Sequence, residues 1–368
     1  MFKLIGVVCL LFAAIFPNVF YRCSVRKMSI NSLQDMIANE KVKNASLSKW
    51  VVLSGLGLHN ILQDLRHVAL LDDRPDEEMD ENLIRDSIPF RPKSSAGYST
   101  IVAYLKSCEK KAQEFEKKYK PVKVRRIVVV PRKNTEEHYK VLFDEVLDIC
   151  KANEIDITKI YILTETIPVL AIKYSHFILD KAAQESVIKY KSQGNNAEML
   201  KDEHFKKVMY SHSRFPFILH ETQLLLGTGF NSNNQRQMKD LGVKSVIHFD
   251  CLKVEKGVEL PQDTQLDFFD EGDLKTLRVT LNPQKFIQFD VIFEEIRKLP
   301  SPRLICDSSD MTVASNFAIA YMMNVNNCDV NKASLFVFSK MGVAEADRLI
   351  YSQLMMYSTT DNGKFKKI

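Results

Sequence analysis

Residues 127–130, Ile-Val-Val-Val, are an unbroken run of β-branched side chains, which is typical of a central strand covered on both faces. Residues 139–150 follow, with apolar side chains spaced as on an amphipathic helix. A second apolar run lies at 160–163. A strand, a helix and a strand in this order predict a parallel sheet of the doubly wound kind.

The same pattern extends in both directions along the chain. Residues 70–75 predict a buried strand that ends in a polar turn, and 98–119 predict an amphipathic helix. A polar stretch at 180–212 predicts a domain boundary. Beyond it, the sequence predicts strands at 223–227, 245–249, 276–281 and 303–306, and helices at 233–241, 287–299, 315–323 and 343–356.

The size and composition of the chain limit what it can be. At 368 residues it exceeds what one hydrophobic core usually serves, so two domains are expected. Its 51 basic and 46 acidic residues are too balanced to indicate a nucleic-acid partner or a membrane surface. The cysteines are scattered, without CxxC or a His-rich cluster, which favours a reducing compartment and argues against a zinc site. No cofactor is implied.

The N-terminus carries an apolar run at residues 4–16, which has the pattern of a signal-peptide core or a short anchor. It is short for a spanning helix, which needs about 20 residues. The basic residues that follow would hold the rest of the chain in the cytoplasm if the run inserted. Alternatively, Met28 is the true start. The expected location is cytoplasmic, with a cytoplasm-facing anchor or entry into the secretory pathway as the alternatives.

A first family pattern lies at residues 70–87. Leu-Leu-Asp-Asp-Arg at 70–74 is followed by Glu78-Met79 and by the stretch 82–87. This order resembles the entrance of the rhodanese fold, LLDVR, then EF, then GHIPGA. A rhodanese presents its catalytic cysteine directly after a strand, but here the run at 127–130 leads to Pro131, which has neither sulfur nor N–H. Cys150 falls on the apolar side of the next helix and is interpreted as a core residue.

A second family pattern covers the C-terminal half. Residues 217–228 contain Gln-Leu-Leu-Leu-Gly-Thr, 237–247 contain Asp-Leu-Gly-Val-Lys-Ser-Val-Ile, and 350–354 end in Gln-Leu. These motifs resemble "LYLGS", "L..LGITHVLN" and "F..QL" of the dual-specificity phosphatases. A rhodanese-like module ahead of such a domain is the plan of the MAP-kinase phosphatases and of the serine/threonine/tyrosine-interacting-like pseudophosphatases. Residues 160–177 resemble the "VYILKGG…YHF" segment of the second group, so the chain is identified as its divergent relative.

The resemblance implies a loop of the form HCxxGxxRS and an aspartic acid, which supply a thiolate, a phosphate-binding arginine and a general acid. Alignment on residues 320–323, Ala-Tyr-Met-Met, puts Asp307 at the nucleophile and Asp310 at the glycine. Val313 takes the place of the arginine, and Pro283 that of the general acid. Every catalytic role is therefore vacant, and the two carboxylates are expected to repel a phosphate dianion.

Two alternatives stay open at this loop. A register shifted by one residue makes Cys306 the nucleophile, but Ser309 and Thr312 then take the glycine and arginine positions, so the cation is still missing. The other alternative is structural: Asp307 and Asp310 cap the helix that follows, where carboxylates satisfy N–H groups that lack partners.

Basic residues flank the apolar run of the first domain. Lys123, Arg125 and Arg126 precede it, and Arg132 and Lys133 follow it. The rhodanese-like modules of MAP-kinase phosphatases dock kinases through basic residues beside apolar ones, so the resemblance makes this edge a candidate protein-binding surface. The alternative is a strand with a solvated basic entrance.

The sequence thus predicts an α/β protein of two domains, a rhodanese-like parallel sheet with flanking helices and then a dual-specificity-phosphatase-like α/β domain. The expected function is that of a catalytically inactive adaptor or competitor in phosphosignalling, and the alternative is an unorthodox hydrolase that uses Asp307 or Cys306. The expected partner is a protein, with MAP kinases and other phosphosignalling proteins as candidates, and a membrane only if residues 4–16 are retained. The predicted organisation is a hydrophobic segment (1–27), a rhodanese-like domain (28–180), a linker (181–212) and a phosphatase-like domain (213–368).

Overall fold

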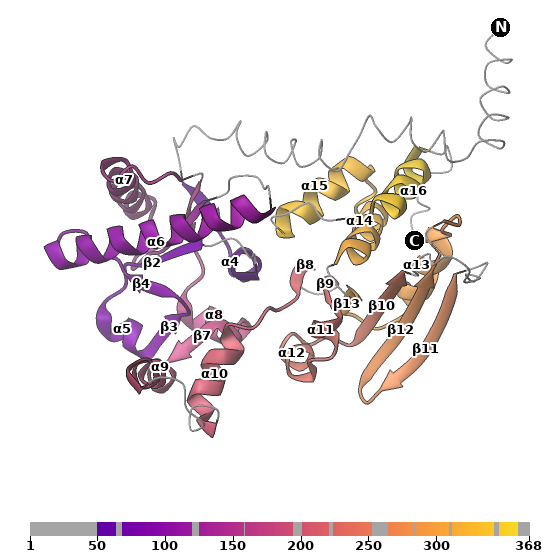
Figure 1. Cartoon of the computed structure of the whole chain (residues 1–368), viewed down its shortest axis with the longest axis horizontal. Helices are drawn as coiled ribbons and strands as arrows, with labels where there is room; N and C mark the ends of the chain where they lie inside the picture. Colours follow the sequence, from indigo (N-terminus) through magenta and orange to yellow (C-terminus); the bar gives the residue numbers. More distant parts are fainter. Residues whose placement is uncertain are drawn as a thin grey trace, which may run out of the picture.

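The computed structural model shows two large β-sheets and one two-stranded sheet, with helices packed around them (Figure 1). It describes residues 50–63, 68–119, 125–157, 159–193, 201–220, 224–251, 264–282, 284–308, 311–341 and 346–359. The apolar run at 4–16 and Met28 lie outside these residues. Within the described stretches, no helix is long and apolar enough to cross a membrane.

The first sheet has five parallel strands in the order β1-β6-β5-β2-β4. β5 lies in the middle, paired on both sides, and all of its residues are buried. The predicted central strand is therefore confirmed, because a β-branched run is stable where both faces of the sheet are covered. The strands are β1 (Val51–Leu53), β2 (Val68–Asp72), β4 (Ser87–Pro89), β5 (Arg126–Val130) and β6 (Lys159–Leu163).

Two long helices cover one face of this sheet, α6 (Ser95–Tyr119) and α7 (Glu136–Ala152). Both are predicted from the sequence, and Ile101 and Leu105 of α6 are buried as the helical spacing requires. The other face is covered by α4 (Gly55–Gln63) and α8 (Ile167–Lys173). Parallel strands with helices on both faces are the doubly wound arrangement that the sequence predicts.

The segment 181–212, predicted as a linker, contains two helices, α9 (Lys181–Gln193) and α10 (Glu203–Ser211), which pack against each other. They follow β7 (Ile178–Asp180), which pairs antiparallel with β3 (Asn82–Ile84) beside the short helix α5 (Asp76–Glu81). The polar composition of this segment reflects largely exposed helix faces. The described residues of this segment, 181–193 and 201–212, are therefore mostly helical.

The second sheet has six strands in the order β11-β12-β10-β13-β9-β8. The four inner strands are parallel, whereas β11 and β8 at the edges run antiparallel to their neighbours. The sequence predicts β9, β10, β12 and β13 but not the two edge strands. The strands are β8 (Phe217–His220), β9 (Leu224–Thr228), β10 (Ser245–Cys251), β11 (Gln265–Glu271), β12 (Leu274–Leu281) and β13 (Arg303–Asp307).

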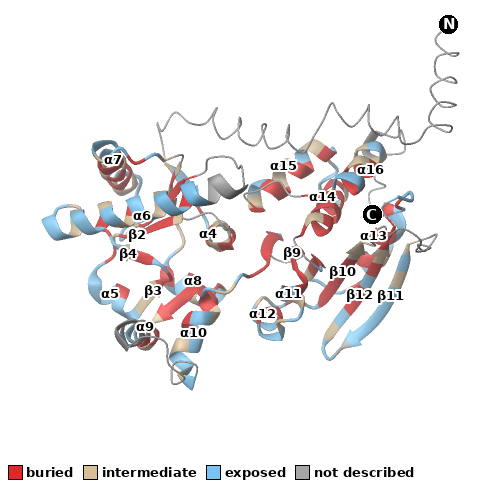
Figure 2. Cartoon of the chain, in the orientation of Figure 1, coloured by how far each residue is buried: buried red, intermediate tan, exposed pale blue. Residues whose placement is uncertain are grey.

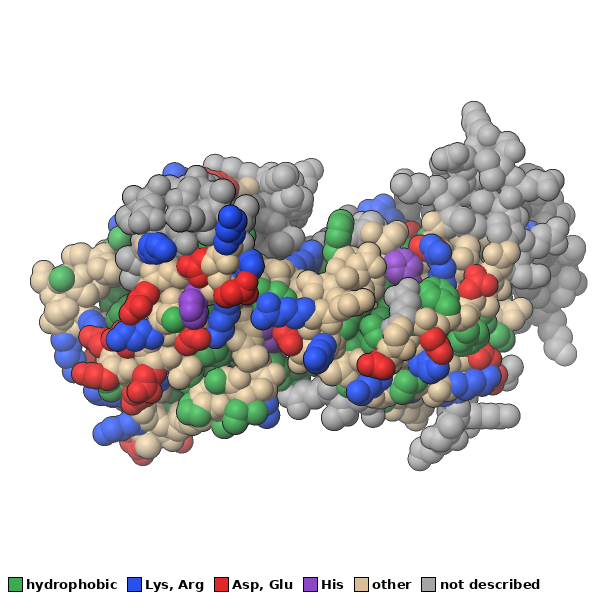
Figure 3. Space-filling view, turned by 90° about the horizontal axis from the view of Figure 1, so that it is seen from below, with side chains coloured by type: hydrophobic (Ala, Val, Ile, Leu, Met, Phe, Trp, Pro, Cys, Tyr) green, Lys and Arg blue, Asp and Glu red, His purple; other side chains and the backbone are tan. Residues whose placement is uncertain are grey.

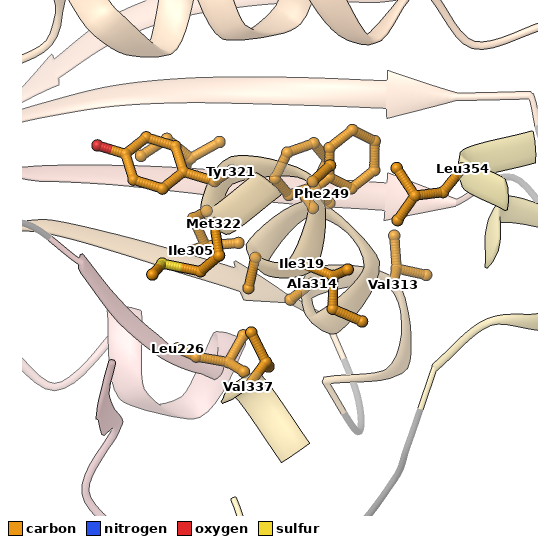
Figure 4. Packing of buried hydrophobic residues seen from close by; sticks show 14 of the residues in the cluster. Leu226, Phe249, Ile305, Val313, Ala314, Ile319, Tyr321, Met322, Val337 and Leu354 are labelled. Carbon is orange, nitrogen blue, oxygen red and sulfur yellow. The ribbon is translucent and has the colours of Figure 1, made fainter. Parts of the chain in front are cut away.

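One face of the second sheet carries four helices and the larger apolar core, part of which is shown in Figure 4. Its central helix, α14 (Thr312–Asn326), is buried from Val313 to Met323, because sheet and helices surround it. The predicted C-terminal helix at 343–356 is wrong at its start, since one helix ends at Met341 and the next begins at Arg348. The four helices are α13 (Phe289–Lys298), α14 (Thr312–Asn326), α15 (Val330–Met341) and α16 (Arg348–Thr359); the short α11 (Gly229–Ser232) and α12 (Gln235–Asp240) lie between β9 and β10 in the chain.

Helix α4 joins the two sheets, and Figure 1 shows it between them. It packs on β8 and on α15. The Asn60 side chain donates to the Ile218 carbonyl and accepts from the Ile218 N–H, both at 2.8 Å. These backbone groups point away from β9, so α4 closes this edge of the second sheet. One apolar cluster accordingly contains Leu58 and Leu70 together with Ile218 and Leu225.

Candidate functional site

The loop after β13 is where the sequence places the phosphatase-like site. β13 lies between β10 and β9, and its carboxyl end leads through residues 308–311 into α14. Backbone N–H groups at the start of a helix lack intrahelical partners and attract anions. The backbone there provides an anion site, whatever side chains it carries. Ser309 and Asp310 lie outside the described residues.

The Asp307 carboxylate occupies this site. Its Oδ1 accepts from the Met311 N–H at 3.0 Å, and its Oδ2 accepts from the N–H groups of Val313 at 2.9 Å and Ala314 at 3.0 Å. The residue is 2% exposed. Asp307 thus has the capping role that its sequence position allows, with α14 beginning at Thr312. These three amides are therefore already bound to a side chain of the protein itself.

Val313, the residue aligned with the phosphatase arginine, contributes only its backbone to the loop. Its side chain is 8% exposed and belongs to the core cluster that also contains Leu354, as Figure 4 shows. Residues 306–316 include no lysine, arginine or histidine. No side chain of this loop can therefore neutralise a bound dianion.

Cys306, the nucleophile of the shifted register, is fully buried. Burial, together with the neighbouring Asp307 charge, raises the pKa of its thiol to about 12. Its Sγ lies 3.5 Å from Nδ1 of His248, whose Nε2 lies 3.2 Å from the Asp250 carboxylate. With its pKa raised, the Cys306 thiol stays protonated at neutral pH, so it is not a thiolate nucleophile.

Sequence reasoning does not reveal this chain of polar contacts, which ends with Arg278 Nε at 2.5 Å from Asp250 Oδ2. His248 on β10 lies in register with Cys306 on β13 and with Arg278 on β12. Only the strand order brings these residues together, so no spacing along the chain indicates them. Across the described residues, no group of three or more His, Cys, Asp or Glu side chains is arranged to hold a metal ion.

Pro283, aligned with the general acid, lies outside the described residues. Its neighbour Asn282 follows β12 at the same edge of the sheet as the loop and is 7% exposed. The Asn282 Oδ1 accepts from the Gln284 N–H at 3.1 Å. This oxygen therefore stabilises the turn after β12.

In the first sheet, Pro131 follows β5 at the position of the rhodanese cysteine. Residues 131–135 lead to α7, whose first turn is capped by Thr135. Beside them, His138 Nε2 lies 2.8 Å from the Asp73 carboxylate. Cys150 is 1% exposed, and burial raises the pKa of its thiol to about 12, so the expected core position is confirmed. No reactive thiol therefore faces the described part of this loop.

The proposed basic edge is not one exposed surface. Arg125 and Arg126 are each 8% exposed, and Arg125 makes ion pairs at 3.0 Å with Glu109 and at 2.9 Å with Asp156. Both residues lie where α6 covers the start of β5, so the expectation of exposed docking residues is wrong for them. Lys123 lies outside the described residues, and Arg132 and Lys133 are exposed. On the face seen in Figure 3, acidic and basic side chains are interspersed.

No protein-family model and no curated protein matches the chain. Solved structures match over part of it. DUSP15 is 15% identical with a TM-score of 0.32, and covers 42% of this chain and 93% of its own. A leucine-rich-repeat and phosphatase-domain protein from Entamoeba histolytica is 15% identical with a TM-score of 0.30, and covers 42% and 96%. A variant of human DUSP28 is 20% identical with a TM-score of 0.27, and covers 36% and 88%. At such identities and TM-scores, the likeness identifies no function for this chain.

Proposed function

We propose that the protein is a phosphatase-like protein without catalytic activity, which acts by binding other proteins in phosphosignalling. The observation that carries this proposal is the Asp307 carboxylate, which accepts three hydrogen bonds from the amides at the start of α14. A phosphatase needs those amides for its substrate and a thiolate beneath them.

A phosphate dianion entering this loop would meet a buried negative charge. Two like charges 4 Å apart repel by about 4 kcal/mol at an effective dielectric near 20, which corresponds to roughly a thousandfold in affinity. A phosphatase offsets the substrate charge with an arginine, but Val313 packs in the core at that position. Electrostatics and hydrogen bonding therefore both favour exclusion of phosphate.

The two cysteines that could serve as nucleophiles support the same conclusion. Cys306 and Cys150 are buried, and burial raises the pKa of each thiol to about 12. At neutral pH, less than about one thiol in ten thousand is ionised at such a pKa. A hydrolase mechanism through Cys306 is accordingly disfavoured, and sulfur transfer in the first domain has no nucleophile at Pro131.

A turnover assay tests the proposal. The full chain is incubated with an activated aryl phosphate, and separately with thiosulfate and cyanide, beside the variants Cys306→Ser and Cys150→Ser. We expect rates equal to the blank for every protein. Phosphate release that disappears in Cys306→Ser, or thiocyanate formation that disappears in Cys150→Ser, would refute the proposal.

We further propose a cytoplasmic protein partner, with MAP kinases and other phosphosignalling proteins as the candidates. Of the basic residues considered for docking, Arg132 and Lys133 are exposed. Capture of partners by the full chain should weaken with Arg132→Glu and Lys133→Glu together, and more at low salt than at high salt. The exposed Lys239 on α12 provides the control, Lys239→Glu. An equal loss of capture with Lys239→Glu would exclude Arg132 and Lys133 as binding residues.

A further inference from the structure

The two edges of the second sheet are treated differently. Helix α4 closes the β8 edge through Asn60, whereas no described strand or helix runs along the outer side of β11. β11 is paired with β12 over all seven of its residues. Its outer backbone N–H and C=O groups are therefore a continuous template for another strand. Figure 2 shows β11 largely in pale blue, the colour of exposed residues, at the margin of the molecule.

β11 lacks two of the features that usually protect an edge strand, proline and lysine. Its sequence, Gln-Leu-Asp-Phe-Phe-Asp-Glu, contains no proline and no lysine. Phe268 is 53% exposed and Phe269 is 39% exposed. Because successive residues point to opposite faces, an aromatic ring stands on each face of the strand. The three acidic residues of β11 disfavour pairing with another acidic strand but not with a basic one, so two exposed aromatic rings on an open edge favour a binding role.

One face of β11 continues the apolar core. Leu266 lies in register with Val279, and Phe268 with Leu277, two fully buried residues of that core. A hollow of about 130 Å³ opens beside Leu266. Its wall includes Phe286, which is 69% exposed. Apolar side chains of an added strand would cover this face.

The other face carries an acidic group without a counter-ion. Asp267 lies in register with Arg278, but the Arg278 Nε is held by Asp250. Among the described residues, Asp267 has no ion-pair partner, whereas Asp270 pairs with Lys275 at 2.6 Å. A basic side chain on this face of an added strand would therefore find a carboxylate.

We propose that β11 binds an extended segment of a partner protein, in which apolar and basic side chains alternate, as a seventh strand of this sheet. The apolar side chains lie beside Leu266 and Phe268, and a basic one lies beside Asp267. A second copy of the chain fits less well, because pairing β11 with itself adds three more acidic residues to the ladder and no basic one. The proposal depends on β11 alone and holds whether or not the loop at Asp307 is catalytic.

The test uses the full chain and a fluorescent seven-residue peptide of alternating lysine and valine. Two control peptides are used. In the first, glutamate replaces each lysine. The second carries N-methyl groups along both of its hydrogen-bonding edges, so that neither edge can form a full ladder with β11. We expect the lysine peptide to bind at least about tenfold more tightly than either control, since one charge reversal or several lost backbone hydrogen bonds costs more than about 1.4 kcal/mol. Amide hydrogen exchange should slow in β11 when the peptide binds.

Two substitutions in β11 have matched controls elsewhere. Asp267→Lys should reverse the preference between the lysine and glutamate peptides, and Phe268→Ser should weaken binding by about threefold or more. Glu294→Lys on α13 and Phe230→Ser on α11, where Phe230 is 81% exposed, should change affinity less than about twofold. The proposal would be overturned if the N-methylated peptide bound as tightly as the lysine peptide, or if Asp267→Lys still preferred the lysine peptide. A dimer of the chain that Phe268→Ser dissociates would overturn it as well.

Discussion

Replacing Asp307 by alanine removes the acceptor of three amide hydrogen bonds at the start of α14. Hydrogen bonds to charged groups contribute about 1.5 to 3 kcal/mol each, and loss of a helix cap costs about 0.5 to 2 kcal/mol. Water that enters the vacated space restores part of the loss. We therefore expect the free energy of unfolding to fall by about 3 kcal/mol, measured by denaturant titration without phosphate.

The same variant should gain an anion site, because the freed amides and the helix dipole then face an unoccupied space. If the variant binds phosphate with a dissociation constant of about 1 mM, 20 mM phosphate would raise its free energy of unfolding by about 1.8 kcal/mol. Chloride at equal ionic strength should restore less, and the wild-type chain should show no phosphate-specific gain.

The control is Asp202→Ala, which removes the cap of α10, where the carboxylate accepts from the N–H groups of His204 and Phe205. That cap is more exposed, so we expect a cost of about 1 kcal/mol and no phosphate effect. If Asp307→Ala costs no more than Asp202→Ala, or if phosphate stabilises all three proteins equally, the carboxylate does not occupy an anion site.

Three further predictions follow from the same contacts. Asp307→Cys alone should not hydrolyse an activated aryl phosphate, because no cation joins the loop; measurable phosphate release would contradict the alignment. Burial lowers the pKa of His59 to about 4 and also lowers that of His176. Below about pH 6.5 the unfolded chain therefore takes up protons that the folded chain does not. The free energy of unfolding should decrease as the pH is lowered, by about 2 kcal/mol at pH 5 from His59 alone. Denaturant midpoints that are equal at pH 7.5 and pH 5 would exclude this. Arg125→Ala should destabilise by about 2 kcal/mol in urea titrations, since it removes a buried guanidinium that pairs with the partly buried Glu109 carboxylate, whereas Lys133→Ala should change stability by less than about 0.5 kcal/mol.

The strands and helices around β5 can be predicted because burial decides them locally. A β-branched run that is covered on both faces has one dominant pattern, and α7 shows its buried stripe in the spacing of Leu142, Val146 and Ile149. β11 carries no such pattern, since the four consecutive residues 267–270, two phenylalanines flanked by two aspartates, are all exposed. Its strand conformation comes from pairing with β12, which a local pattern cannot indicate.

In the candidate site, too, some features can be predicted from the sequence and others cannot. A carboxylate between a strand and a helix is a recognisable cap, so the role of Asp307 can be expected from sequence. The contact of Cys306 with His248 depends on two strands that are 58 residues apart and adjacent in the sheet. Arg125 was expected at a solvated strand entrance, yet Glu109 of α6 covers it. Long-range packing, and not composition, determines these two outcomes.

The closure of β8 by α4 has a consequence for how the chain is made. Asn60 and Ile218 are 158 residues apart, so at about 5 to 20 residues per second the ribosome delivers β8 roughly 8 to 30 s after α4. During that time the side-chain amide of Asn60 lacks the backbone groups that it binds in the finished fold, and Leu58 lacks the apolar side chains of the second sheet. α4 can therefore pack on the first sheet early, but its contacts with the second sheet form late. Until β8 is translated, the face of α4 that binds β8 has no partner strand.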